Sequence, residues 1–160
     1  MRLLVLLLLL ASPALSHPDL VTLRATDLDD GRVVVCEHVL IGEPIILTFT
    51  HSMYGGDVRE TFIPTEDGRL QRIEMTTANE AAAEYYAYDA PVIREHGRFR
   101  VDVPPEMYED VVIHVDHVGH HRLTVNGRQI DLLRRAGDEH DVQIQVRRIG
   151  LKARLTGSAC

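Results

Sequence analysis

Short runs rich in valine, isoleucine and leucine recur along this sequence of 160 residues, each separated from the next by residues that favour tight turns. The turns at residues 29–31, 66–68 and 126–127 all combine aspartate or asparagine with glycine. About nine or ten short strands at such regular spacing are typical of an all-β protein. We therefore expect a single antiparallel β-sandwich or barrel-like domain.

One segment departs from the strand pattern. Residues 79–88 read NEAAAEYYAY, in which Asn79 suits a helix N-cap and the alanines and glutamates favour helix. The run is also short enough to be a strand that packs through its tyrosines, so both interpretations stay open. Residues 89–98 are expected to form a loop. The expected strands are 21–25, 32–39, 45–52, 58–63, 70–76, 99–103, 111–118, 123–125, 128–132 and 142–147.

The segment from Pro44 to Pro64 predicts a β-hairpin closed by Gly55-Gly56, because two glycines suit a type I′ turn of two residues. That turn would place His51 directly opposite Glu60, at the end of an apolar stripe. A carboxylate beside an imidazole orients the ring and favours its charged form, which is useful for binding or proton transfer. The pair is therefore the best candidate site, although it could equally close the end of the sheet.

Ser52 and a separate cluster of tyrosines supply further candidate contacts. Ser52 follows His51, but adjacent residues of a strand point to opposite faces, so a nucleophile–base pair is not expected and Ser52 is a secondary ligand contact. Tyr85 and Tyr86 lie beside Glu84, and aromatic rings next to a carboxylate can line a site for a sugar or an amine. Such tyrosines can instead cap the core and leave their hydroxyl groups in water.

A second cluster of polar residues runs from His114 to His121. If residues 118–119 form a two-residue turn, Asp116 faces His121 and His114 lies nearby on the same face. Two histidines and an aspartate could bind a divalent metal such as Zn²⁺ or Cu²⁺. The sequence matches no standard metal motif, so the alternative is a set of exposed histidines on a hairpin, with no cofactor.

The first residues, MRLLVLLLLLASPALSHPD, have the pattern of a signal peptide. Arg2 supplies a positive start, an apolar run follows, and small residues at positions 14 and 16 predict cleavage before His17. The run is shorter than the roughly 20 residues that cross a bilayer, so no transmembrane span is expected in the mature chain. We expect export to a periplasmic or extracellular location, with a leader at 1–16, one β domain at 17–151 and a tail at 152–160.

The two cysteines, Cys36 and Cys160, could form a disulfide in such an oxidising compartment. Cys36 could instead be a small core residue of a valine-rich strand, and Cys160 a frayed terminal residue.

The stretch FTHSMYGGDVRETF resembles the small exported family called domain of unknown function 1850. The alanine- and tyrosine-rich segment at 81–86 and the asparagine–glycine hairpin are similar as well, and the likeness covers roughly residues 20–150. Residues 56–57 depart from the family, which tends to have a pair such as Thr-Pro there, and a family run like Ser-Phe-Gly-Ala-Gly is not recognisable. The positions that carry the resemblance are His51, Ser52, Tyr54, Val58, Glu60 and Phe62.

The resemblance implies an exported domain with no established reaction, often associated with TRAP transporters of the TAXI type. Our first hypothesis is therefore a non-enzymatic module that binds a membrane transporter or a small-molecule ligand. The second is a small metal-dependent or acid–base enzyme that uses His51, Glu60 and the 114–121 cluster. A structural cell-surface module is a third. A nucleic-acid partner is not expected, because the net charge of −7 repels phosphates.

Overall fold

The computed structural model describes residues 20–149 except residue 88. Several expectations concern residues outside this part. They are the leader, the limits of the domain, Tyr88 and the disulfide between Cys36 and Cys160, since Cys160 is not among the described residues. The described elements are β1 (Leu20–Asp27), β2 (Val33–Leu40), β3 (Ile45–Thr50), β4 (Asp57–Pro64), β5 (Leu70–Thr77), α1 (Glu80–Ala87), β6 (Val92–Glu95), β7 (Arg98–Val101), β8 (Glu106–Tyr108), β9 (Asp110–Val115), β10 (Arg122–Val125), β11 (Arg128–Asp131), α2 (Leu132–Ala136) and β12 (His140–Arg148).

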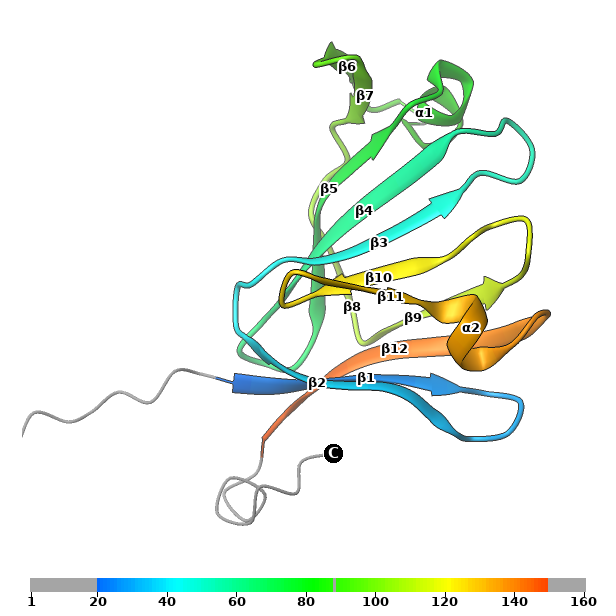
Figure 1. Cartoon of the computed structure of the whole chain (residues 1–160). Coiled ribbons are helices and arrows are strands. Elements are labelled where there is room, and N and C mark those ends of the chain that lie inside the picture. Colours follow the sequence, from blue (N-terminus) through cyan, green and yellow to red (C-terminus); the bar gives the residue numbers. More distant parts are fainter. Residues whose placement is uncertain (1–19, 88, 150–160) are drawn as a thin grey trace, which may run out of the picture.

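These strands form two antiparallel sheets, so the prediction of an all-β, sandwich-like fold is confirmed (Figure 1). One sheet has the order β2-β1-β12-β9, and the other has the order β11-β10-β3-β4-β5-β7-β6, with β8 paired to β5. The main core lies between the sheets and contains apolar residues of both, among them Leu23 and Ile144 from the first and Leu47 and Leu123 from the second. Strand alternation supplies these residues, because successive side chains point to opposite faces.

A second, smaller core lies between α1 and the larger sheet. It is formed by Val58, Met75 and Val101 of the sheet with Ala83 and Ala87 of the helix, all buried. The small alanine side chains allow the helix to lie close to the strands. Of the two interpretations of residues 79–88, the helical one is confirmed.

The start of α1 is fixed by its N-cap. The Asn79 side-chain oxygen accepts hydrogen bonds from the backbone N–H groups of Ala81 (2.9 Å) and Ala82 (3.3 Å). The amide nitrogen of Asn79 donates to the carbonyl oxygen of Tyr54, 2.7 Å away. The cap therefore also ties the helix to the loop between β3 and β4, and this places the tyrosines of α1 beside that loop.

The predicted register of the first hairpin is wrong. Leu47, not His51, is the partner of Glu60, and Phe49 is the partner of Val58. Relative to the prediction, the pairing of the two strands is shifted by an even number of positions. Glu60 therefore stays on its expected face of the sheet but has a different partner.

The loop between β3 and β4 is longer than two residues, because the backbone hydrogen bonds that close it start at His51 and not at Tyr54. The backbone N–H of His51 donates to the carbonyl oxygen of Gly56 (3.0 Å), and the N–H of Gly55 donates to the carbonyl of His51 (2.8 Å). Both glycines have the expected positive φ, at 66° and 80°. Residues 51–56 thus form one compact loop that a two-residue turn cannot describe.

The strand hairpin considered for residues 118–119 does not form. β9 ends at Val115 and pairs with β12, whereas β10 belongs to the other sheet and pairs with β3 and β11. Residues 116–121 therefore cross from one sheet to the other. By contrast, the asparagine–glycine hairpin is confirmed with its register, since Leu123 pairs with Ile130. β6 lies in a segment expected to be a loop, and β8 and α2 were not expected.

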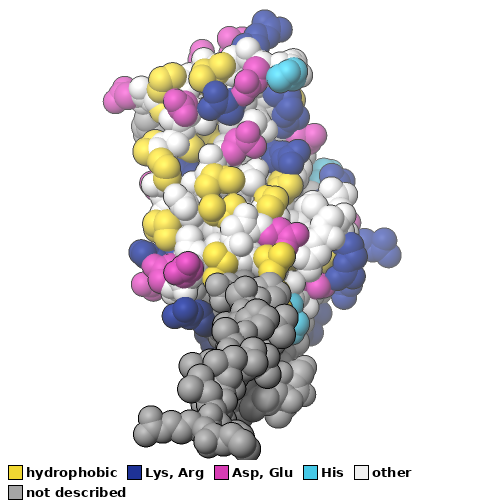
Figure 2. Space-filling model, turned by 90° about the vertical axis from the view of Figure 1, so that its left-hand side faces the viewer, with side chains coloured by type: hydrophobic (Ala, Val, Ile, Leu, Met, Phe, Trp, Pro, Cys, Tyr) yellow, Lys and Arg dark blue, Asp and Glu magenta, His cyan; other side chains and the backbone are white. Residues whose placement is uncertain are grey.

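The surface carries both signs of charge. On the face shown in Figure 2, hydrophobic side chains alternate with acidic and basic ones, and no large area of that face is of a single charge. The apolar side chains with the largest exposed fractions are distributed over several elements, and three of them, Met53, Tyr54 and Tyr85, belong to the β3–β4 loop and α1.

Candidate functional site

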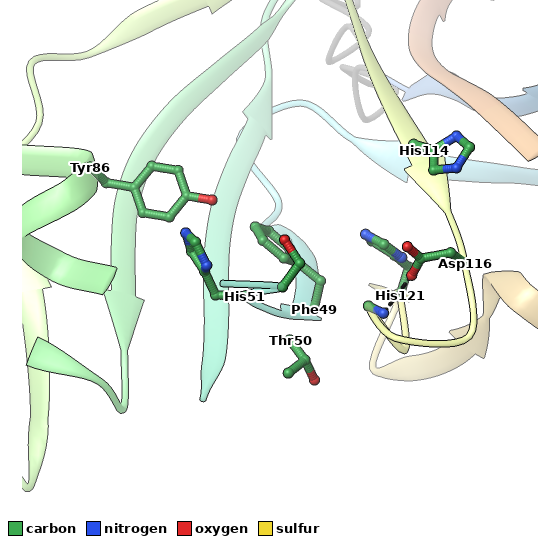
Figure 3. A pocket seen from close by; sticks show the side chains of 9 residues that line it. Phe49, Thr50, His51, Tyr86, His114, Asp116 and His121 are labelled. Carbon is green, nitrogen blue, oxygen red and sulfur yellow. Dashed lines mark hydrogen bonds between the residues drawn. The ribbon is translucent and has the colours of Figure 1, made fainter. Parts of the chain in front are cut away.

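A cavity of about 270 Å³ lies where the β3–β4 loop, α1 and the loop between β9 and β10 meet (Figure 3). Its walls bring together residues from both of the polar clusters singled out in the sequence, which the expected topology did not place near each other. The lining residues are Phe49, Thr50, His51, Ser52, Tyr86, His114, Asp116, Gly119 and His121.

His51 is buried, with 7% of its surface exposed, and its ring is held by the backbone. The ring atom Nδ1 accepts the N–H groups of Met53 (3.2 Å) and Tyr54 (3.3 Å). Because Nδ1 accepts, the proton of the neutral ring lies on Nε2. His51 therefore offers a donor and not a base, and Ser52 beside it gains no activating partner.

Aromatic rings surround His51. Tyr54, Tyr85 and Tyr86 have ring centroids 5.0, 5.3 and 5.5 Å from the imidazole, and both contacts with the helix are edge-to-face. Of the predicted tyrosines, Tyr86 lines the cavity, while Tyr85 packs on His51 from an exposed position. Such a cluster holds the imidazole in one orientation.

Tyr86 keeps its hydroxyl proton at neutral pH. Burial raises its pKa to about 12, and the nearby negative charge of Glu60 acts in the same direction. The hydroxyl group points toward the His51 ring (Figure 3). Together the two side chains present hydrogen-bonding groups on one wall of the cavity.

The opposite wall is formed by Asp116 and His121. The Asp116 carboxylate accepts the N–H of Gly119 (2.5 Å), and this bond lowers the pKa of the aspartate, which stays ionised. His121 is 9% exposed and stacks on Phe49, with ring centroids 5.6 Å apart and planes at 19°. Its Nδ1 is buried and makes no hydrogen bond within the described part of the chain. Burial lowers the pKa of His121, so the ring is neutral at neutral pH.

The titration of His121 makes the stability of the fold depend on pH. The pKa in the folded state lies below the value of about 6.5 in the unfolded chain, so the unfolded state binds more protons between the two values. The contribution of His121 to stability is therefore fully present above about pH 6.5, and it falls as the pH drops toward the lowered pKa. Urea unfolding at pH 7.5 and 5.5 checks this, with His121→Phe as the control that keeps the ring stack. Between pH 7.5 and 5.5 the free energy of unfolding should fall less in His121→Phe than in the wild type. Equal falls in the two proteins would contradict this expectation.

Glu60 lies outside the cavity. Its carboxylate accepts a hydrogen bond from Arg72 Nη1 at 3.2 Å, and Arg72 Nη2 reaches Glu106 at 2.6 Å. Burial raises the pKa of Glu60, while the charge of Arg72 opposes the rise. The expected His51–Glu60 pair therefore does not form, and Glu60 acts on the site only through its charge near Tyr86.

The predicted metal trio shares one cavity but is not tightly clustered. Its members, His114, Asp116 and His121, all line the wall described above. Within the described residues, the groups whose ligand atoms all lie within 4.8 Å of one another are two others. They are Asp27, Asp29 and His140, and His117, Asp138 and Glu139. Both join residues far apart in the sequence, which strand pairing brings together and which no local spacing would reveal.

A comparison with known protein families finds a match for this chain. The family model described as Domain of unknown function (DUF1850) matches residues 45–132, which is more than half of the chain. Every residue that lines the cavity lies in this matched segment. No curated protein and no solved structure matches the chain.

Proposed function

The chain belongs to the family described as Domain of unknown function (DUF1850), and we propose that it is a binding module for a small polar molecule, not an enzyme. The observation that carries the proposal is the cavity between His51 and Asp116, in which a few polar groups converge between ring-lined walls. Pockets that bind small molecules have this character. A non-enzymatic role is supported by His51, whose ring can donate but is already occupied as an acceptor.

The charges of the cavity indicate the kind of ligand. Asp116 is ionised, His121 and Tyr86 are neutral, and His114 is paired with the carboxylates of Asp141 and Glu139, so a cationic group is favoured next to Asp116. The rings of Phe49 and Tyr86 suit a cation as well. His51 Nε2 requires an acceptor on the same ligand. A volume of about 270 Å³ corresponds to about nine water molecules, so the cavity has room for an amino acid or an amine together with bound water.

Tyr86→Phe tests the proposal, because it removes one hydroxyl group and keeps the ring. We expect the variant to weaken binding about tenfold, the loss of one hydrogen bond, without changing the fold. The measurement is calorimetric titration of the protein with amino acids, primary amines and quaternary ammonium compounds, after a thermal-shift screen. Tyr108→Phe is the matched control, since this half-buried tyrosine lies outside the cavity. Equal affinities of wild type and Tyr86→Phe, or no binding across the panel, would contradict the proposal.

A second candidate function is a metal-dependent or acid–base enzyme. It is favoured by one observation, the placement of His114, Asp116 and His121 around the same cavity as His51. In this case a divalent metal in the cavity would activate a water molecule. Hydrolysis of ester substrates that depends on added Zn²⁺ and is lost in Asp116→Asn would support this candidate over the binding module.

We further propose that the protein is exported and works beside a membrane transporter, of the TAXI-type TRAP class that the resemblance implies. The leader-like residues 1–16 support export. In the described residues no helix is long and apolar enough to cross a membrane. The exposed Met53, Tyr54 and Tyr85 near the cavity offer an apolar contact for a partner. Fusion of residues 1–20 to alkaline phosphatase tests export, and solute uptake by a strain that carries Asp116→Asn tests the link to transport.

A further inference from the structure

A group of histidines and carboxylates lies beside the cavity, where β9 ends and β12 begins. β9 and β12 are antiparallel, with His114 opposite Asp141, so the loop after β9 lies next to the loop before β12. His117 belongs to the first loop, and Asp138 and Glu139 belong to the second. Because all of these side chains are exposed, an ion can reach them from solvent.

The distances between the possible ligand atoms match those around a metal ion. His117 Nδ1 is 3.2 Å from an oxygen of Asp138, and His114 Nε2 is 3.3 Å from an oxygen of Glu139. The ligand atoms of His117, Asp138 and Glu139 all lie within 4.8 Å of one another. Two atoms that are each bound to Zn²⁺ at its usual distance in a tetrahedral site are about 3.3 Å apart. Glu139 therefore links His114 to the compact group that His117, Asp138 and Glu139 form.

A further carboxylate orients one of the histidines. Asp141 Oδ1 is 2.8 Å from His114 Nδ1, so Nδ1 carries a proton and Nε2 is the atom that faces Glu139. A histidine that binds a metal through one nitrogen commonly donates from the other to a carboxylate, which fixes the ring and strengthens the ligand. Asp141 takes this supporting position without being a ligand itself.

The charge of the group favours a cation. Within the described residues, the ion pairs of Asp138, Glu139 and Asp141 are all with histidines, and none is with lysine or arginine. Three carboxylates are thus paired only with two imidazoles. A divalent ion supplies the positive charge that these carboxylates do not receive from lysine or arginine in the described part of the chain.

We propose that His114, His117, Asp138 and Glu139 bind a divalent transition-metal ion such as Zn²⁺. Two imidazoles with two carboxylates form a ligand set that suits Zn²⁺, Ni²⁺ or Cu²⁺ better than Ca²⁺ or Mg²⁺, which require oxygen ligands. This site differs from the possible metal ligands of the cavity. His114 is common to both, but the cavity set adds Asp116 and His121, whereas this site adds His117, Asp138 and Glu139. The inference does not depend on the proposed function of the cavity.

The other compact group, at Asp27, is a structural pair and not a second metal site. One oxygen of Asp27 accepts the N–H of Asp29 (3.0 Å), and the other lies 2.8 Å from His140 Nδ1. The Asp27 side chain is fully buried, and the contacts that satisfy it come from the protein.

Calorimetric titration of the tag-free full chain with ZnCl₂ at pH 7.5 tests the proposal. We expect one ion per chain with micromolar or tighter affinity. His117→Ala and Glu139→Gln should each weaken binding by at least about tenfold. His96→Ala, at an exposed histidine of the β6–β7 turn, is the matched control and should bind as the wild type does. Lowering the pH to 5.5 should release the ion, since the imidazoles must lose their protons to bind it.

Three results would overturn the proposal. The first is the absence of binding at micromolar or lower Zn²⁺ in the folded wild type. The second is equal affinity in His117→Ala, Glu139→Gln and the wild type. The third is loss of binding in Asp116→Asn together with full binding in Glu139→Gln, which would place the ion in the cavity. Far-ultraviolet circular dichroism shows that each variant is folded, as expected for changes at exposed side chains.

Discussion

Asp27→Ala is expected to lower the free energy of unfolding by about 3 kcal/mol, the largest loss of stability predicted for this protein. The Asp27 side chain has no exposed surface. It joins the β1–β2 turn, through the N–H of Asp29, to β12, through His140. Removing the carboxylate leaves the N–H of Asp29 without its acceptor, breaks the contacts with His140 and Arg32, and leaves a small void, and these penalties add.

Chemical denaturation followed by circular dichroism measures this loss, and two variants serve as controls. Asp102→Ala removes an exposed carboxylate whose contact with Arg100 is 3.5 Å, and it should change stability by no more than about 0.5 kcal/mol. Asp27→Asn keeps an acceptor for Asp29 and should cost less than the alanine variant. A loss below about 1 kcal/mol in Asp27→Ala would show that the pair is not a structural tie.

Much of the fold follows from local patterns. The last strand alternates buried Val142, Ile144 and Val146 with polar residues as expected, because one of its faces packs on the core. The hairpin at residues 126–127 has its expected register, since asparagine and glycine favour a single turn type. In the β3–β4 hairpin, Gly55 and Gly56 alone did not determine the length of the loop or the register of the strands. The imidazole of His51 binds two backbone N–H groups, and this stabilises a longer loop that no residue pattern reveals.

The residue types of the site could be predicted, but their grouping could not. His51, Tyr86 and the pair of Asp116 and His121 were singled out in three separate groups, and the structure places all four residues around one cavity. Their proximity depends on the crossing of residues 116–121 between the two sheets, which strand alternation alone does not predict. Long-range pairs are missed for the same reason. Asp27 and His140 lie 113 positions apart and meet only because β1 pairs with β12.

Gly119→Ala is expected to disrupt the cavity and to lower the free energy of unfolding by about 1–3 kcal/mol. A Cβ atom at this position would lie 2.1 Å from Cε1 and 2.6 Å from Nδ1 of His121. The backbone of Gly119 does not have a positive φ, so the cost comes from this overlap and not from backbone strain. The imidazole must then leave its stack on Phe49, and it takes one wall of the cavity with it.

A double-mutant cycle separates this effect from a general loss of packing. In a His121→Ala background the ring is absent, so adding Gly119→Ala should cost no more than about 0.5 kcal/mol. The coupling between the two substitutions should therefore account for most of the loss seen in Gly119→Ala alone. Ligand binding should fail in Gly119→Ala even where the fold persists, because Asp116 and His121 no longer face His51 and Tyr86. Equal costs in both backgrounds would mean that the contact with His121 is not what requires glycine here.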